Sequence, residues 1–198
     1  LSLTTDMEGA FEGCTSLVGT TLNDWNTAEV TNMKDMFNGA TAFNGNITSW
    51  NTAAVTDMSS MFYNAIAFNK DINTSGDSWN TAKVTDMAYM FRDTDAFNGN
   101  ISSWNTANVT NTYKMFNSAT AFNQPLTHSG NTWDLGNVTD MRNMFDGATG
   151  FTTNNYDIFL YSQANNSGIE SNITITVSSK FCDQVSRDFL TGTKNWTI

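Results

Sequence analysis

The chain has 198 residues, of which 14% are charged, and a formal net charge of −10 at pH 7, a length that fits one elongated domain. Its nine Lys and Arg residues are scattered singly and form no basic patch for nucleic acid, and no run of about 18 apolar residues would span a bilayer. An acidic, weakly charged surface rich in Asn, Thr and Ser is typical of the outside of a cell.

One repeated unit organises the chain before Phe151. Its clearest copy, residues 50–72, reads W-N-T-A-A-V-T-D-M-S-S-M-F-Y-N-A-I-A-F-N-K-D-I. Successive copies are offset alternately by 25 and 29 residues, as one valine column shows: Val30, Val55, Val84, Val109 and Val138. Repetition at a period of roughly 20–50 residues predicts a solenoid, propeller or array. The longer copies carry their extra residues at 73–78 and 127–132, which predicts loops on one edge.

Eight apolar positions recur in each copy and predict the core. In the clearest copy they are Val55, Met58, Met61, Phe62, Ala65, Phe68, Ile72 and the following Trp79. No single period runs through them, so we expect a short strand, a tight helical turn and a second short strand in each coil. Stacked coils can bury columns that one coil cannot. We also expect the repeated Asn of each Phe-Asn pair to hydrogen-bond the turning backbone.

The first copy, residues 1–24, diverges from the others. Phe11 falls in the phenylalanine column, and Cys14 falls in the alanine column, where we expect a small buried residue. The other cysteine, Cys182, lies about five coils away, or ~25 Å at the usual strand spacing. A disulfide needs Cα atoms within roughly 7 Å, so we expect no intrachain bridge.

Residues 151–198 break the period and predict a capping unit that seals the last coil. We expect a short helix around Tyr156, a strand at 172–177, a helix at 183–190 and a final strand at 196–198. The chain therefore reads as one domain: residues 1–150 form a repeat solenoid of about six coils, and residues 151–198 form its α+β cap.

The sequence A-F-E-G-C-T-S-L at residues 10–17 resembles the BspA-like leucine-rich repeats of bacterial surface proteins. The later copies, W-N-T-A-x-V-T-x-M-x-x-M-F-x-x-A-x-A-F-N, resemble the variant of that repeat in mycoplasma and other bacterial surface lipoproteins. The strand of that repeat frequently has the sequence F-N-Q-P-L, which is present at residues 122–126. The resemblance runs repeat by repeat from residue 4 to residue 150.

The resemblance implies a right-handed, mainly β coil of the leucine-rich-repeat type, with short strands and tight helical turns. It also implies a surface adhesin that binds host or neighbouring-cell proteins. We accordingly expect an extracellular or cell-surface module, monomeric and not inserted in a membrane, that is part of a longer exported protein.

Catalytic chemistry finds no support in the sequence, and we expect no enzyme activity and no cofactor. The only histidine, His128, lies in an insert loop and reads as a solvated residue. An acidic column follows the repeated threonine at Asp57, Asp86 and Asp140, and repeated oxygen ligands of this kind can bind Ca²⁺. Asn replaces Asp in two copies, at Asn32 and Asn111, however, which favours side chains that cap their own turns.

Ligand binding is expected where the copies differ, beside each invariant Met-Phe pair. The aromatic and basic residues at these positions are Tyr63, Tyr89, Arg92, Tyr113, Lys114 and Arg142. Tyr and Arg dominate interface energetics, so these residues predict a face that binds a protein or peptide. The rival patch lies on the strand side of the coils: Asn46, Lys70, Asp71, Asn100 and Gln124.

Two other functions stay open. Repeated Asn-Thr pairs, such as Asn51–Thr52 and Asn80–Thr81, predict an array that could order water or bind carbohydrate, and hence an ice- or glycan-binding face. The alternating four-residue insertions make a flat face harder to keep. A structural spacer that binds no ligand is the third reading.

Overall fold

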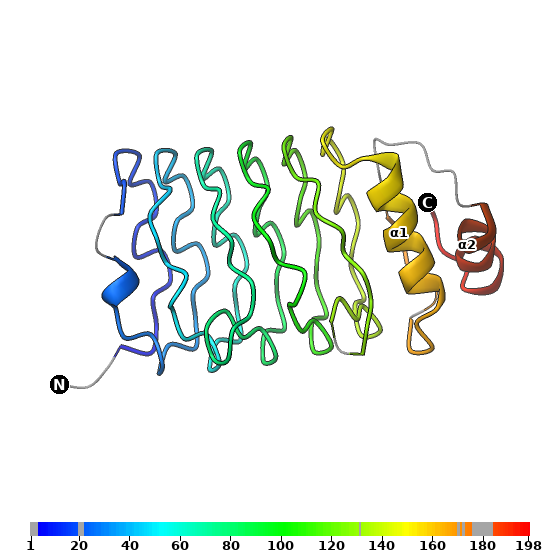
Figure 1. Cartoon of the computed structure of the whole chain (residues 1–198), viewed down its shortest axis with the longest axis horizontal. Helices are drawn as coiled ribbons and strands as arrows, with labels where there is room; N and C mark the ends of the chain where they lie inside the picture. Colours follow the sequence, from blue (N-terminus) through cyan, green and yellow to red (C-terminus); the bar gives the residue numbers. More distant parts are fainter. Residues whose placement is uncertain (1–3, 20–21, 131, 170, 172, 176–183) are drawn as a thin grey trace.

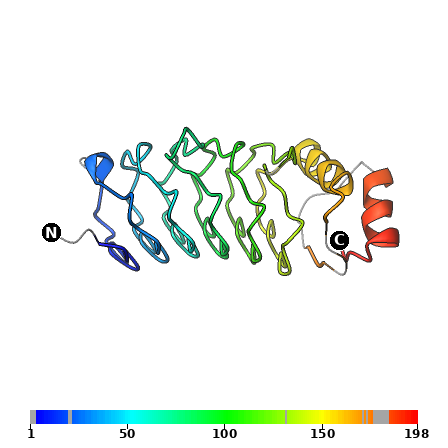
Figure 2. The same ribbon diagram turned by 90° about the horizontal axis from the view of Figure 1, so that it is seen from below.

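The computed structural model describes residues 4–19, 22–130, 132–169, 171, 173–175 and 184–198. The chain forms a row of stacked coils with the N-terminus at one end and helices α1 (Thr153–Ala164) and α2 (Gln184–Asp188) at the other (Figures 1 and 2). One column of parallel bridges joins successive coils through equivalent residues: Asp6, Asn32, Asp57, Asp86, Asn111 and Asp140. This column identifies six coils that are stacked in register.

Each coil contacts the next through a run of overlapping turns, seen clearly in residues 33–40. Within the coil, the N–H groups of Met36, Asn38 and Ala40 donate to carbonyls three residues earlier, at 3.0–3.3 Å. The intervening N–H groups, such as those of Asp35 and Phe37, donate instead to the following coil. Every second backbone N–H therefore closes a turn, and the others hold neighbouring coils together.

These turns stand where one tight helical turn is expected, and the short strands expected on either side are absent apart from the isolated bridges. Asp35 and Gly39 have φ of 54° and 71°, and the equivalent residues of later coils also have positive φ. A turn whose third residue has positive φ is of type II, whereas a strand needs extended backbone at every position. The prediction of a right-handed, mainly β leucine-rich-repeat-like coil is therefore wrong, because the described residues form isolated bridges and no β-strand. In the sequence, these turns are indicated only by the lack of a regular spacing between apolar residues.

The core follows the predicted columns. In the third coil, Val55, Met58, Met61, Phe62 and Phe68 are fully buried, and the equivalent residues of the following coils are buried too. Phenylalanines of one column stack face to face, and Phe62 lies 5.6 Å from both Phe37 and Phe91, centroid to centroid. Burying each such side chain contributes roughly 1.5–3 kcal/mol. The prediction that like residues pack on like residues in successive coils is confirmed here.

The buried tryptophans also satisfy backbone carbonyls. The indole Nε1–H of Trp104 donates to the carbonyl oxygen of Ile72 at 2.7 Å, and that of Trp79 donates to Ile47 at 2.9 Å. A buried carbonyl oxygen without a hydrogen-bond donor destabilises the fold. Each indole therefore fills its column and also satisfies a carbonyl oxygen of a neighbouring coil. Trp25, in the first coil, is 41% exposed.

The predicted amide column is confirmed as well. The Oδ1 of Asn44 accepts the backbone N–H of Asn69, Asn69 does the same for Asn98, and Asn98 for Asn123, at 2.9–3.1 Å. Asn123 then accepts the N–H and hydroxyl of Thr152, both at 3.0 Å. The column thus joins the last coil to the residue that caps α1.

Four helical segments are present in the described residues. They are the 3-10 helix η1 (Leu22–Asp24), α1 (Thr153–Ala164), α2 (Gln184–Asp188) and the π-helix η2 (Phe189–Thr193). α1 lies across the end of the stack (Figure 1), with Tyr156, Phe159 and Leu160 buried against it. The short helix predicted around Tyr156 is therefore confirmed.

The rest of the cap differs from the prediction. The helix expected at 183–190 is present from Gln184 onward, and Asp183 lies outside the described residues. The two predicted strands reduce to one parallel bridge between Thr174 and Thr197. Residues 172, 176 and 177 of the first strand lie outside the described residues.

Cys14 corrects another prediction, because its side chain is exposed and free rather than buried. It lies in the first coil, where the alanine column has a neighbouring coil on one side only in this structure. Cys182, with which no disulfide is expected, lies outside the described residues.

A candidate binding surface on the turn face

Three side-chain columns flank the buried Met-Phe pair on the turn face of the coils. In the fifth coil these positions are Tyr113, Lys114 and Asn117, and in the fourth coil they are Ala88, Tyr89 and Arg92. Met115 and Phe116 between them are fully buried, so the backbone that carries the variable residues is fixed to the core. The type II turns keep these side chains at one edge of every coil.

One half of the surface is built around Arg92. Its guanidinium carbon lies 5.2 Å from the ring centroid of Tyr63 in the preceding coil and 5.8 Å from that of Tyr89 in its own coil. Asp93 forms an ion pair with Arg92 at 3.2 Å. Cations over aromatic faces within about 6 Å are attracted by the ring quadrupole, so the two tyrosines hold the guanidinium between them.

The other half is built around Tyr113. Its ring meets Tyr89 edge to face, with centroids 5.1 Å apart and planes at 90°. Lys114 Nζ lies 5.3 Å and Arg142 Cζ 5.2 Å from its centroid. Tyr89 and Tyr113 therefore link the two halves into one continuous group across four coils.

We call these six residues the Tyr/Arg cluster: Tyr63, Tyr89, Arg92, Tyr113, Lys114 and Arg142. All six are the residues singled out by the sequence, and the structure brings every one of them into contact with another. Five are half-buried and Arg142 is exposed.

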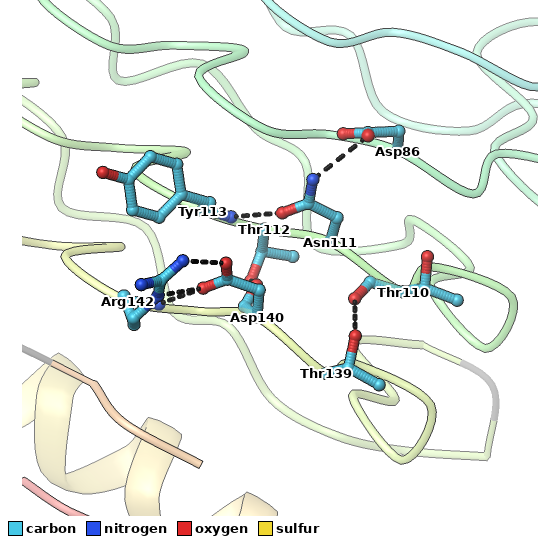
Figure 3. A network of polar contacts seen from close by, with 8 residues as sticks. All are labelled: Asp86, Thr110, Asn111, Thr112, Tyr113, Thr139, Asp140 and Arg142. Carbon is cyan, nitrogen blue, oxygen red and sulfur yellow. Dashed lines mark hydrogen bonds and ion pairs between the residues drawn. The ribbon is translucent and has the colours of Figure 1, made fainter.

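Asp140 is a neighbour of the cluster whose pairing with Arg142 the repeat pattern does not predict, although the sequence places it in the acidic column. It lies beside Tyr113, and its carboxylate binds Arg142 through Nε at 3.0 Å and Nη2 at 2.7 Å (Figure 3). The side-chain hydrogen bond from Arg142 holds the pKa of Asp140 below its ordinary value. Asp140 and Arg142 are two residues apart, and Oδ1 of Asp140 also accepts the backbone N–H of Arg142. Because this cap places the two side chains close together, the spacing in the sequence indicates the pair.

The calcium candidates act as turn caps in this structure. Oδ1 of Asp57 accepts the N–H of Ser59, and Oδ1 of Asp86 accepts the N–H of Ala88, both at 2.8 Å. Asn111 occupies the same place, and its Oδ1 accepts the N–H of Tyr113, which explains why this column holds both Asn and Asp. The capping interpretation is confirmed. Among the described residues, no group of three or more His, Cys, Asp or Glu side chains is arranged to hold a metal ion.

The Asn-Thr pairs do not form an exposed array. Thr52 and Thr81 are buried, and their hydroxyls donate to the carbonyls of Asn80 and Asn105 in the next coil at 3.0 and 2.8 Å. The Asn side chains cap the following turn, as Asn51 does for Ala53. These pairs are therefore structural connections between coils.

The rival strand-side patch is also engaged in contacts between coils. Asp71 Oδ1 accepts the N–H of Asn100 at 2.8 Å, and Gln124 Nε2 donates to the carbonyl of Asn98 at 2.8 Å. Asn46 Oδ1 accepts from Thr48 within its own turn. Side chains held in this way have fewer polar atoms left for a partner.

A cavity of about 360 Å³ lies between the second insert loop and α1. It is lined by His128 and, along one face of α1, by residues such as Asp157, Ile158 and Tyr161. His128 is half-buried and its Nδ1 is enclosed, so the expectation of a solvated loop residue is wrong. The cavity lies at the junction of stack and cap, whereas the Tyr/Arg cluster lies on the coils.

A family model described as "Mycoplasma protein of unknown function, DUF285" matches residues 1–78 and again residues 73–175. The chain belongs to the DUF285 family. The two tandem matches run through the coils and past the end of α1, and they end before α2. Comparison with curated proteins and with solved structures finds no match. No helix in the described part of this DUF285 chain has the length and apolar character needed to cross a bilayer.

Proposed function

We propose that this DUF285 chain is a non-catalytic binding module that recognises a protein or peptide through the Tyr/Arg cluster. The observation that carries the proposal is the meeting of Tyr63, Tyr89, Arg92, Tyr113, Lys114 and Arg142 in one group on four successive coils. These are positions where the repeats differ, whereas the residues beneath them are repeated. Variation above a fixed framework is typical of recognition surfaces.

The composition of the cluster supports a macromolecular partner. Tyr and Arg are enriched among the residues that contribute most to interface energy, and tyrosine adds contact area at low entropic cost. The backbone beneath is rigid, since Tyr89 and Lys114 donate their N–H groups to the next coil at 2.9 and 3.1 Å. A preorganised surface pays less for binding than a mobile one.

The cluster holds no nucleophile paired with a base. It contains no Cys, Ser or His, and its carboxylate neighbours Asp93 and Asp140 are already paired with arginines. Binding without chemistry is therefore the function that its side chains support best.

We further propose that the module works at the cell surface and is related to the BspA-like leucine-rich-repeat adhesins. Two observations support this: the sequence resemblance of the repeats, and the assignment to a Mycoplasma family. The partner would then be a protein on a host or neighbouring cell.

The test replaces Tyr63, Tyr89 and Tyr113 together by Ser and measures adhesion of the purified protein to intact target cells. We expect adhesion to fall at least tenfold while circular dichroism and the melting temperature stay near the wild-type values. Tyr161→Ser is the matched control, because Tyr161 is 62% exposed and lies on α1 away from the cluster. Equal adhesion of the triple variant and the wild type would remove this face from consideration.

A second candidate function, ice or carbohydrate binding, is favoured by a different threonine column. One exposed Thr per coil forms a row: Thr5, Thr31, Thr56, Thr85, Thr110 and Thr139. Each hydroxyl from Thr31 onward donates to the carbonyl of the preceding member at 3.1–3.2 Å, as Thr139 does to Thr110 in Figure 3. Thermal hysteresis or shaped ice crystals at micromolar protein would support this candidate, and their absence would exclude ice. A spacer would show neither activity nor adhesion.

A further inference from the structure

We propose that the Tyr/Arg cluster binds an acidic peptide segment, with ligand carboxylates on its cations and ligand apolar side chains on its tyrosines. This inference rests on the proposed function and specifies its ligand class. It is carried by the charge distribution and by the donor geometry of the two arginines.

The cluster gathers basic side chains on a chain that is otherwise acidic, and it keeps a small positive excess after pairing with Asp93 and Asp140. The chain carries nine Lys and Arg residues against a net charge of −10. Three of these nine are in the cluster, one on each of three successive coils: Arg92, Lys114 and Arg142. A partner that is steered to this face by charge must be negative at the point of contact.

Arg142 is prepared to bind a second carboxylate. A guanidinium has five N–H donors, and Asp140 uses the Nε donor and one of the two on Nη2. The Arg142 side chain is 61% exposed, so the end that carries Nη1 faces solvent. Asp140 and the Tyr113 ring fix the plane of the guanidinium, which leaves its outer edge oriented for a bidentate carboxylate.

Arg92 is held in a similar way on the fourth coil. Its guanidinium lies over Tyr63 and Tyr89, and Asp93 pairs with it at 3.2 Å. An arginine already fixed by two rings loses little entropy when it binds a ligand. The rings themselves present apolar edges beside the charge, where an aliphatic or aromatic ligand side chain can pack.

The balance of charges favours a peptide over a densely charged polyanion. Asp93 and Asp140 neutralise two of the three cations, so the cluster keeps only a small positive excess. A sulfated glycan would bring many negative charges against a chain of net charge −10. A peptide with a few carboxylates among apolar residues matches both the tyrosines and the small excess.

The test measures binding of three short peptides to the whole chain by fluorescence anisotropy: alternating Glu-Leu, alternating Gln-Leu and alternating Lys-Leu. We expect the Glu-Leu peptide to bind at least tenfold more tightly than the other two, and its affinity to fall as salt is raised. Heparin fragments of similar length form a fourth arm. Heparin binding tighter than Glu-Leu, with the same dependence on the arginines, would overturn the assignment to a peptide.

The variants are Arg142→Gln and Arg142→Lys, with Lys83→Gln as the control, since Lys83 is exposed and outside the cluster. We expect R142Q to weaken Glu-Leu binding at least tenfold, R142K to fall between it and the wild type, and K83Q to match the wild type. Arg142 is exposed, so these variants are expected to fold, and Arg92→Gln adds an independent substitution. Equal binding of the Glu-Leu and Gln-Leu peptides would overturn the inference. If the tyrosine triple variant still lost cell adhesion, the proposed function would survive that result.

Discussion

Tyr89 and Lys114 occupy the same place in successive coils, and both hold a left-handed backbone, with φ of 59° and 54°. Residues with a Cβ rarely adopt this conformation, and Gly, Asn or Asp usually occupies it. The same place in other coils holds Gly9, Asp35 and Asn143. Tyr89 and Lys114, two members of the Tyr/Arg cluster, therefore accept backbone strain that Gly, Asp or Asn reduces at this place in other coils, and such strain is typical of functional positions.

The strain at this place predicts that Ser60→Asn stabilises the protein. Ser60 has φ of 55° and is not part of the cluster, and Asn tolerates the left-handed region better than Ser. We expect the free energy of unfolding to rise by about 0.5–1 kcal/mol, because part of a left-handed penalty of roughly 1–2 kcal/mol is removed. Urea denaturation measures the change. Ser16→Asn, at an exposed residue without positive φ, serves as the control and is expected to be neutral.

The tryptophan column predicts that Trp104→Phe destabilises the stack. The substitution keeps an aromatic ring but leaves the buried Ile72 carbonyl without the indole donor. The unsatisfied carbonyl alone is expected to cost about 1–3 kcal/mol, with lost packing in addition. Trp25→Phe is the control, since Trp25 is partly exposed. A Trp104→Phe variant as stable as the Trp25→Phe variant would contradict the role given to the indole N–H.

The core could be predicted from the sequence because each buried position is repeated several times. Val55, Phe62 and Trp79 each belong to a column whose members share one environment, so one residue type recurs. The backbone conformation is harder to predict from the sequence, since the positions with left-handed backbone hold Gly, Asn, Asp, Ser, Tyr or Lys. Without a consistent residue type there, the sequence predicts one tight helical turn in place of the observed run of turns.

Close approach of two coils predicts that Gly99→Ala is damaging. A Cβ at Gly99 would lie 2.0 Å from the carbonyl oxygen of Lys70 in the preceding coil, so the backbone must shift. We expect a loss of about 1–3 kcal/mol, the usual cost of overpacking. Gly192→Ala, in η2, meets no atom within 4 Å and is expected to be neutral or slightly stabilising. Thermal unfolding of the two variants compares them directly.

The Asp140–Arg142 pair predicts a measurable titration. Arg142 holds the pKa of Asp140 below its ordinary value of 3.8. Because the folded-state pKa is depressed, the stabilisation from this pair is present above pH 3.8 and is lost as the pH falls through the lower folded value. In R142Q we expect the Asp140 pKa to rise towards 3.8, as followed by NMR of its carboxyl carbon. An unchanged pKa would contradict the geometry in Figure 3.

The members of the Tyr/Arg cluster could be predicted from the sequence, but their contacts could not. Tyr63 and Arg92 share a column, which places them on neighbouring coils, whereas Tyr89 and Tyr113 come from adjacent columns. Their edge-to-face contact depends on turn geometry that the sequence does not reveal. Asp140 was interpreted as a turn cap or calcium ligand because its column is repeated, and its pairing with Arg142 is unique to one coil.

The alternating turns give the turn face of the stack a lengthwise electric dipole, although bonds elsewhere in the coils, such as Thr56 N–H to the Thr31 carbonyl, run the other way. In residues 33–40 and their equivalents, all four N–H groups that cross to a neighbour point towards the C-terminal cap, and the accepting carbonyls point back. In an ordinary sheet such bonds alternate in direction and their dipoles largely cancel. Beneath the Tyr/Arg cluster they add from coil to coil, so inserting further coils of this kind would lengthen the dipole as well as the molecule.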